Sequence, residues 1–180
     1  MKHFYYYPKI DYSDNTAVNI MIRAKIRDVV LRNGALYYKY KVSDGDRPDI
    51  ISSKYYGNSQ YTWAIFYANN ILNPQTEWFK DYRNFVSYIK NKYSSIEYAK
   101  STIHHYEYKD AFSDNVYIVD ESTYNDYLSE YQINPQTFRT VYPVNIYDYE
   151  NSLNESKRDI VVLDKGFIFS IDNELSNIFS

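Results

Sequence analysis

The chain of 180 residues is long enough for one domain, or a small domain with extensions, and roughly 70% of the unfolded surface of such a chain is buried on folding. Lys and Arg total 20 against 23 Asp and Glu, a net charge of −3 without the basic excess that nucleic-acid phosphates require, so we expect no nucleic-acid partner. There is no Cys, which excludes disulfides and thiolate metal ligands, and the longest apolar run (63–68) is far below the ~20 residues of a membrane span, so we expect no membrane partner.

Tyrosine is the unusual component of the composition. The 24 tyrosines help to bring aromatic residues to 19% of the chain. A tyrosine side chain offers a large contact area and keeps a polar tip, so it suits surfaces that are wet when free and buried when assembled. The composition therefore favours protein assembly, the alternative being that many tyrosines are half-buried in an ordinary core.

The first 35 residues are expected to form an arm and a helix. His3 to Pro8 is prone to form a strand and is stopped by its proline. Asp14, Asn15 and Thr16 can cap a helix that ends at Asn33-Gly34. Its apolar residues recur at helical spacing: Val18, Met21, Ile22, Ile26, Val29 and Val30.

Residues 36–76 are expected to contain a strand and two helices. A β-prone run ends at Val42, and Asp44-Gly45 follows as a turn. We expect Asp46 to cap the next helix, with Pro48 in its first turn, and Gly57 to end that helix in a left-handed conformation.

The second of these helices follows almost at once. Asn58 or Ser59 can cap it, and aromatic and apolar residues recur at three- and four-residue spacing up to Asn73-Pro74, which we expect to end it. These residues are Trp63, Ala64, Phe66 and Tyr67, and Asn70 continues the same spacing.

Residues 77–143 are expected to add helices and a β-hairpin. An amphipathic helix is predicted from six apolar residues: Trp78, Tyr82, Phe85, Val86, Ile89 and Tyr93. Ser94 and Glu97 have the spacing of a capping box, so a short helix is expected to start there. Residues 104–108 and 116–119 are predicted to pair as a hairpin.

A third helix is expected over 121–131, followed by a loop over 132–143.

The last segment, 144–180, is predicted to contain a helix over 147–157, a buried strand over 159–163 and a terminal helix. Ile168, Ile171, Leu175 and Ile178 lie at helical spacing and are followed by Phe179. We expect this apolar stripe to dock on a neighbouring subunit, with Pro143 as the point where the chain leaves the body. Truncation after Tyr142 would then leave the rest folded.

Motifs of catalysis and of metal binding are lacking. We find no Gly-rich phosphate loop, GxSxG elbow or HExxH helix, so we expect a protein that is not an enzyme and has neither a cofactor nor a small-molecule substrate. His105 and Glu107 would share one face of a strand, but a catalytic zinc needs three ligands, so we expect no metal site. Asp44 and Asp46 invite a calcium interpretation, but Pro48 stands where the third ligand of an EF-hand is required.

Three stretches together resemble one protein family. DGDRPDIISSKYYG (44–57) with the following Trp63 and Asn69-Asn70, STIHHYE (101–107) and VNIYDYENSLNESKRDIVVLDK (144–165) resemble the baseplate wedge subunit of T-even-type contractile-tailed bacteriophages, the first of them its LysM-like segment. The resemblance implies an α+β fold with a LysM-like strand-helix-helix core. The chain then divides into four parts, which can also form one continuous domain: an N-terminal arm and helix (1–35), the LysM-like core (36–76), a helical and β-hairpin extension (77–143) and a C-terminal docking segment (144–180).

The resemblance also implies a function. A wedge subunit binds other baseplate wedge proteins, with copies in neighbouring wedges among its partners, and helps neighbouring wedges join around the hub. Such a protein would be assembled in the host cytoplasm and reside in the tail of the virion. The alternative is a peptidoglycan-binding LysM-type module with its groove between 44–48 and 69–73, against which stands the lack of aromatic residues in the first of these loops.

Ten residues are expected to bind partners, five in the core segment and five in the C-terminal segment. They are Asp46, Arg47, Tyr56, Tyr67, Asn70, Ile168, Ile171, Leu175, Ile178 and Phe179.

Overall fold

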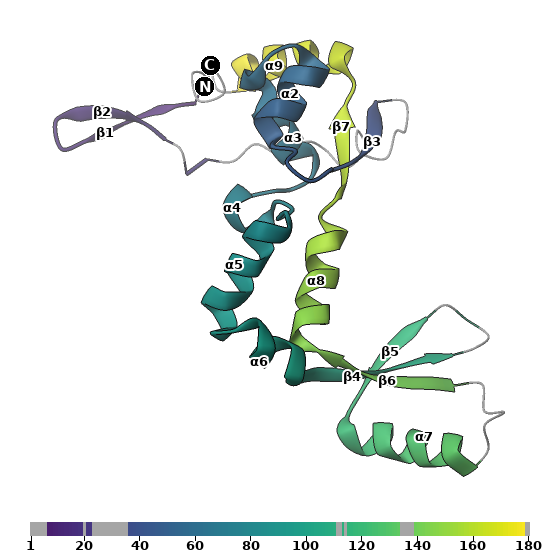
Figure 1. Ribbon diagram of the computed structural model, residues 1–180. Coiled ribbons are helices and arrows are strands. Elements are labelled where there is room, and N and C mark those ends of the chain that lie inside the picture. The colour runs from purple at the N-terminus through teal and green to yellow at the C-terminus, as the bar shows by residue number, and fades with distance from the viewer. Residues whose placement is uncertain are drawn as a thin grey trace. The chain divides into compact units, whose positions relative to one another are not determined.

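A computed structural model describes residues 7–19, 21–22, 36–110, 113, 115–133 and 139–178 (Figure 1). It combines helices with small antiparallel sheets, which confirms the predicted α+β class. The chain forms two compact units, one from residues 1–79 and 157–180 and one from 80–156. This division differs from the four consecutive parts expected from the sequence, because the first unit joins both ends of the chain.

The first unit contains the following elements: β1 (Lys9–Tyr12), β2 (Asn15–Val18), β3 (Tyr37–Lys41), α2 (Pro48–Tyr56), the 3-10 helix η2 (Ser59–Tyr61), α3 (Thr62–Ala68), α4 (Pro74–Glu77), β7 (Asp159–Leu163) and α9 (Lys165–Ile178). The second unit contains α5 (Tyr82–Tyr93), α6 (Ile96–Ser101), β4 (Ile103–Asp110), β5 (Val116–Val119), α7 (Glu121–Ile133), β6 (Arg139–Asn145) and α8 (Ile146–Ser156).

The N-terminal region begins as a hairpin, so the prediction of a helix starting at 14–16 is wrong. β1 pairs with β2 in antiparallel register, and Ser13 and Asp14 between them both have left-handed backbones, with φ of 47° and 64°. Two left-handed residues form the turn whose twist matches that of the flanking strands. The predicted helical residues 23–35 and the first six residues of the arm lie outside the described part of the chain.

A strand-helix-helix-strand arrangement forms the core of the first unit. β3 pairs antiparallel with β7, from Tyr37 opposite Leu163 to Lys41 opposite Asp159. The buried core draws on β7, on α2, α3 and α9, on the residue that follows β3 and on Phe79: Val42, Ile51, Tyr56, Trp63, Ala64, Ile65, Ala68, Phe79, Ile160, Val162, Leu163 and Ile168. Since each large apolar side chain contributes roughly 1.5–3 kcal/mol when buried, the residues of β7 and α9 supply a substantial part of this core.

The C-terminal segment is therefore not a separate docking element, and that prediction is wrong. Residues 144–156 belong to the second unit and 157–180 to the first. Ile168, predicted to bind a partner, is 1% exposed and packs in the core of the first unit, and Ile171 packs against the same core. The predicted terminal helix is present as α9, but the surface that covers Ile168 is this chain's own.

The start and end of α2 follow the predicted residues with one correction. Pro48 occupies the first turn, and Gly57 closes the helix at φ 77°, donating its N–H to the Ser53 carbonyl. Asp46, however, does not cap α2. Its carboxylate accepts the Ser43 N–H at 2.9 Å and the Tyr40 O–H at 2.8 Å, so it stabilises the turn that precedes the helix.

α3 ends earlier than predicted. Asn58 caps η2 as expected, by accepting the Gln60 N–H, but α3 stops at Ala68. Asn73-Pro74 starts α4 rather than ending α3, because the Asn73 side chain accepts the N–H of Gln75 and Pro74 needs no helical donor.

The helices of the second unit enclose a small core of its own. Phe85 and Ile89 on α5 pack with Ala99 on α6 and Ile146 on α8. α5 is capped by Asp81, so Trp78 lies outside it, contrary to prediction. α6 exists as predicted but is capped by Ser95, one residue later than expected.

A three-stranded antiparallel sheet of order β5-β4-β6 completes the second unit. The predicted hairpin of β4 and β5 is confirmed, and so are α7, α8 and β7. The predicted loop over 132–143 is partly wrong, since β6 begins at Arg139 and pairs along β4. Residues 134–138 lie outside the described residues.

The helices that the structure describes include none with the length and apolar character to cross a membrane.

Candidate functional site

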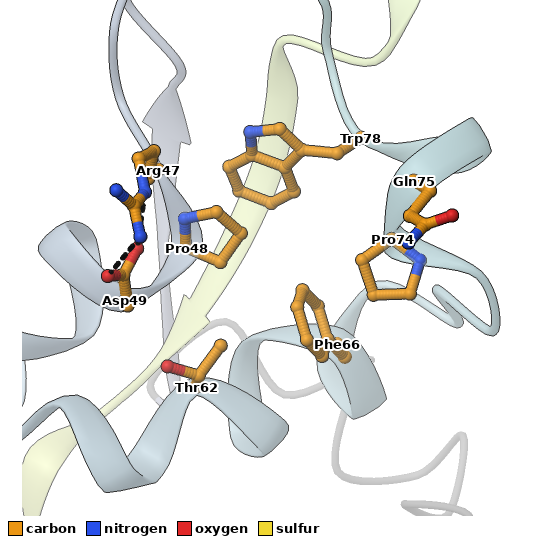
Figure 2. A pocket seen from close by; sticks show the side chains of 8 residues that line it. All are labelled: Arg47, Pro48, Asp49, Thr62, Phe66, Pro74, Gln75 and Trp78. Carbon is orange, nitrogen blue, oxygen red and sulfur yellow. Dashed lines mark hydrogen bonds and ion pairs between the residues drawn. The ribbon is translucent and has the colours of Figure 1, made fainter.

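A pocket of about 450 Å³ opens on the first unit. Its lining comes from the starts of two helices, from α3 and from the residue that follows α4 (Figure 2): Arg47, Pro48, Asp49, Thr62, Phe66, Pro74, Gln75 and Trp78. The rings of Trp78, Pro48, Phe66 and Pro74 are grouped around it, and Arg47 and Asp49 lie together at one end.

Local sequence places the two prolines. Pro48 and Pro74 each occupy the first turn of a helix, where no backbone donor is needed. The chain before Pro74 is held by Glu77, whose carboxylate accepts the N–H groups of Leu72 at 2.6 Å and Asn73 at 3.1 Å. Both proline rings therefore face the pocket from rigid helix starts.

Trp78 is fixed by a contact distant in sequence. Its indole N–H donates to the Asp46 carbonyl at 3.2 Å, and its ring meets Phe66 edge to face with centroids 6.5 Å apart. Because the only polar atom of the ring is already bonded, Trp78 presents an apolar surface to the pocket.

The charges at the rim neutralise each other. The Arg47 guanidinium donates to the two carboxylate oxygens of Asp49 at 3.1 and 2.9 Å. Both side chains are well exposed, so the pair contributes at most about 1 kcal/mol to stability. The pocket thus has an apolar lining with a paired charge at its edge. It suits an apolar or aromatic side chain, or the apolar face of a sugar ring.

Two of the residues predicted to bind partners serve the fold instead. Burial alone would raise the pKa of Asp46, but the hydrogen bonds from Ser43 and Tyr40 outweigh it and lower that pKa below its ordinary value. Tyr56 is 5% exposed, and its O–H donates to the Leu163 carbonyl at 3.1 Å. Tyr56 is therefore a core residue, and its assignment to a contact surface is wrong.

The other predicted residues are scattered. Arg47 is at the pocket rim, while Asn70 is exposed and has a left-handed backbone with φ 54°. Tyr67 is half-buried, with its hydroxyl 2.6 Å from that of Tyr7. The side chains of Leu175 and Ile178, and all of Phe179, lie outside the described residues.

The histidines of the second unit form a chain of contacts. Nε2 of His105 lies 2.8 Å from Oε1 of Glu107, and Nδ1 of His105 lies 2.8 Å from Nδ1 of His104. The His104 ring stacks on Tyr149 at 3.9 Å between centroids. His105 and Glu107 do share a face, as expected. Among the described residues, however, no group of three such side chains is placed to hold a metal ion.

Sequence reasoning missed the four rings of the pocket: Pro48, Phe66, Pro74 and Trp78. One signal was available. If Asn73-Pro74 had been interpreted as a helix start, like the capped starts elsewhere in the chain, Trp78 would have followed a four-residue helix instead of opening α5.

These features define an α+β protein whose strand-helix-helix-strand unit carries an apolar pocket and is interrupted by a second compact unit. No protein-family model matches this chain, and no curated protein matches it in sequence.

Proposed function

We propose that this protein is a structural subunit of the baseplate wedge of a contractile-tailed phage. It would bind other wedge proteins and help neighbouring wedges join around the hub in the assembling virion. One observation carries the proposal: β3, α2 and α3 follow one another as the strand-helix-helix unit that the resemblance implies, and they share one buried core, to which β7, paired with β3, adds a second strand.

The stretches that carry the resemblance have structural roles consistent with the proposal. Residues 44–57 form the turn before α2, the helix itself and its left-handed end. Residues 144–165 run from the end of β6 through α8 and β7, and so cross from the second unit to the first. Because the resemblance covers residues of both units, we expect both units to take part in the assembly role.

The insertion also favours an assembly role. A complete unit of residues 80–156 interrupts the first unit before β7. A second compact unit offers additional surface for neighbours, and the exposed tyrosines supply contact area of the kind found at interfaces. Tyr12, Tyr38, Tyr82 and Tyr98 are each more than half exposed.

Affinity capture from infected cells tests the proposal. The tagged full-length chain, expressed during infection, should recover other tail baseplate proteins, identified by mass spectrometry. Phe66→Ala would test whether the pocket contributes, with Leu72→Ala, an exposed apolar residue outside the pocket lining, as the matched control. Recovery of no tail protein by the unaltered chain would refute the assembly role.

A second candidate function, peptidoglycan binding, is favoured by one specific observation. The first loop of the expected glycan groove lacks aromatic residues, but Phe66 and Trp78 bring two rings to a pocket beside that loop. Stacking on such rings is a common mode of sugar recognition.

Tryptophan fluorescence separates the two functions. The chain has 2 Trp, of which Trp63 is buried and Trp78 lines the pocket, so an N-acetylglucosamine oligomer bound there should shift the emission of Trp78. Saturable binding that Phe66→Ala abolishes would establish the glycan function. An unchanged spectrum at millimolar oligomer would exclude it.

A further inference from the structure

Two histidines meet where the sheet of the second unit joins its helices (Figure 1). β4 follows α6 after one residue, and β6 runs directly into α8. The Ile146 N–H at the start of α8 donates to the carbonyl of Thr102, the residue before β4, at 3.0 Å. His104 and His105 lie on β4 immediately beyond this joint.

A bulge in β4 brings the two imidazole rings together. β4 advances by two residues from Ile103 to His105. Its partner strand β6 advances by only one over the same stretch, so His104 is the extra residue of the bulge. Adjacent side chains of a regular strand point to opposite faces, and a bulge re-aims one of them. The two rings therefore contact each other, with their Nδ1 atoms 2.8 Å apart.

The partners of His105 determine which ring nitrogens carry protons. Nε2 of His105 lies 2.8 Å from a carboxylate oxygen of Glu107, and an ionised carboxylate only accepts hydrogen bonds, so this Nε2 carries a proton. In the neutral ring the other nitrogen, Nδ1, is then an acceptor. The proton between the two rings consequently belongs to Nδ1 of His104. The neutral pair thus combines an Nε2–H tautomer at His105 with an Nδ1–H tautomer at His104.

This arrangement accepts one further proton but not two. A proton added at Nε2 of His104 still leaves a single N–H between the two Nδ1 atoms, so the hydrogen bond remains. When both rings carry two protons, each Nδ1 directs an N–H at the other, and two positive charges meet at hydrogen-bond distance. The contact at 2.8 Å is incompatible with that form.

The titratable groups that face the pair come from β4, β6 and α8. Glu107 on β4 bonds His105, and the Tyr142 hydroxyl on β6 also donates to Glu107. Tyr149 on α8 stacks on His104 at 3.9 Å between centroids. Among the described residues one carboxylate thus contacts the pair, which balances one imidazolium but not a second. Other charged residues of β4 and of the adjoining helices are Lys109, two residues beyond Glu107, Lys100 over the Tyr147 ring, Asp148 bonded to Asn145, and Glu150 bonded to Lys92.

We propose that the contact between His104 and His105 is a pH-sensitive link between β4 and α8. It is closed while the pair carries at most one added proton, and it opens when both rings are protonated, which releases His104 from Tyr149. Because the open form binds one more proton than the closed form, acid favours opening. Histidines are the side chains that commonly change charge between about pH 5 and 8, so this is the range to test. The link belongs to this chain alone and does not rest on the assembly role.

Long-range 1H–15N correlation spectra of the full-length chain at about pH 8 test the closed form. The chain has 3 His, so a His3→Gln background leaves only the signals of the pair. We expect the Nδ1–H tautomer for His104 and the Nε2–H tautomer for His105. Nε2–H tautomers in both rings would leave the two Nδ1 atoms without a shared proton and would contradict the proposal.

A titration of the same protein from about pH 8 to about pH 5 tests the opening, in a range where ordinary carboxyl groups stay ionised. Once both rings are protonated, we expect the Tyr149 ring signals to move toward those of an unstacked tyrosine. The Ile146 amide, bonded to Thr102 across the same joint, should lose hydrogen-exchange protection. We expect a loss of roughly tenfold, which corresponds to a tenfold preference of the second proton for the open form.

His104→Phe separates stacking from protonation. The phenyl ring can still lie on Tyr149, but it has no nitrogen to oppose a fully protonated His105. We expect the Tyr149 signals and the Ile146 protection of this variant to stay constant over the whole range. His104 is exposed, so the variant should fold. His3→Gln alone is the matched control and should leave the acid response as it is in the natural chain.

Two further results would overturn the proposal. The first is an absence of change in the Tyr149 and Ile146 signals down to about pH 5, whether or not both rings become protonated. The second is an acid response that persists in His104→Phe, which would assign the response to another group. Both measurements use the purified chain without a partner, so their outcome is independent of whether tail proteins are captured.

Discussion

Glu150 on α8 is a buried charge of the second unit that three hydrogen-bond donors share. The carboxylate is 5% exposed and accepts hydrogen bonds from the Lys92 ammonium at 2.7 Å, the Tyr93 hydroxyl at 2.6 Å and the Tyr88 hydroxyl at 3.0 Å. Burial would raise the pKa of Glu150, but these bonds outweigh it and lower the pKa below its ordinary 4.5. The same contact raises the pKa of Lys92. These hydrogen bonds link α5 to α8 and stabilise the packing of the two helices.

Glu150→Gln should destabilise the protein by roughly 1–3 kcal/mol at pH 7, because the amide removes the charge that three donors share and turns its own N–H groups toward them. Denaturant unfolding measures the loss. Glu155→Gln, an exposed glutamate on the same helix, should change the free energy of unfolding by less than about 0.5 kcal/mol.

The same variant has a defined pH dependence. Because folding lowers the pKa of Glu150, its stabilising contribution is present above the ordinary pKa of 4.5 and is lost as the pH falls through the folded value. The difference in unfolding free energy between the natural chain and Glu150→Gln should therefore shrink in acid. A difference that stays constant from pH 7 to pH 3 would assign the effect to shape rather than charge.

The side-chain amide of Asn69 makes the hydrogen bonds to β7 that a neighbouring strand would otherwise make. Its amide nitrogen donates to the Val161 carbonyl and its amide oxygen accepts the Val161 N–H, both at 2.8 Å, while the same nitrogen reaches the Ile65 carbonyl. One side chain thus bonds both main-chain groups of Val161 on the side of β7 away from β3.

Asn69→Ala should cost roughly 1–3 kcal/mol, since it leaves two main-chain groups of Val161 without these partners. Hydrogen exchange should show faster exchange of the Val161 amide, and thermal unfolding should shift downward. Asn70→Gly is the control: Asn70 is exposed and left-handed, a conformation that glycine adopts freely, so little change is expected. Equal effects of the two changes would argue against the bonding role of Asn69.

At the scale of elements, β7 and α9 complete a core that begins more than one hundred residues earlier. Ile160, Val162, Leu163 and Ile168 are all buried against α2 and α3. Without them, β3 would lose its only described partner strand, and Ile51 and Trp63 would lose their cover.

Truncation after Ser156 should therefore abolish folding of the first unit, the opposite of the expectation drawn from the sequence. Amide signals of residues 36–79 should collapse to unfolded positions in two-dimensional NMR, while those of the second unit remain dispersed. Truncation after Asn173 keeps Ile168 and Ile171 and should preserve the core signals. A folded first unit without β7 would restore the docking interpretation of the C-terminal segment.

At the scale of the molecule, the second unit is an insertion whose two ends are tied together. The Asn154 amide donates to the Lys80 carbonyl at 2.8 Å and accepts the Lys80 N–H at 2.9 Å. The ends of the first unit are also close where the insertion leaves it, since the Arg158 guanidinium lies 3.6 Å from the centre of the Phe79 ring. Lys157 donates to the Thr76 carbonyl at 2.9 Å.

Replacing residues 80–156 by a short Gly-Ser linker should consequently leave a folded first unit, and residues 80–156 should fold alone. Circular dichroism and thermal melting of the two products should each show a cooperative transition. Failure of the first product alone would mean that the inserted unit stabilises β7. Failure of both would show that the two units fold only together.

The features that the sequence determined by itself are those that depend on neighbours along the chain. Pro48 and Gly57 mark the limits of α2, as predicted. The β4–β5 hairpin and α7 also lie where they were predicted, and His105 and Glu107 share one face of their strand as expected. Each of these features follows from a hydrogen bond or a steric preference between residues a few positions apart. Such local preferences do not depend on where the segment lies in the folded protein.

The tertiary structure decided which surfaces meet. The stripe of Ile168 and Ile171 has the same spacing whether it faces this chain or a neighbour, so its partner could not be inferred from spacing. From the sequence, the Asp46 carboxylate could have bonded either the first turn of α2 or the turn before that helix. It bonds the turn, because the Ser43 N–H and the Tyr40 O–H both point at it. The pocket likewise depends on the bond from Trp78 to the Asp46 carbonyl, 32 residues apart. Contacts between distant segments are set by how complete faces pack, and no local pattern encodes that choice.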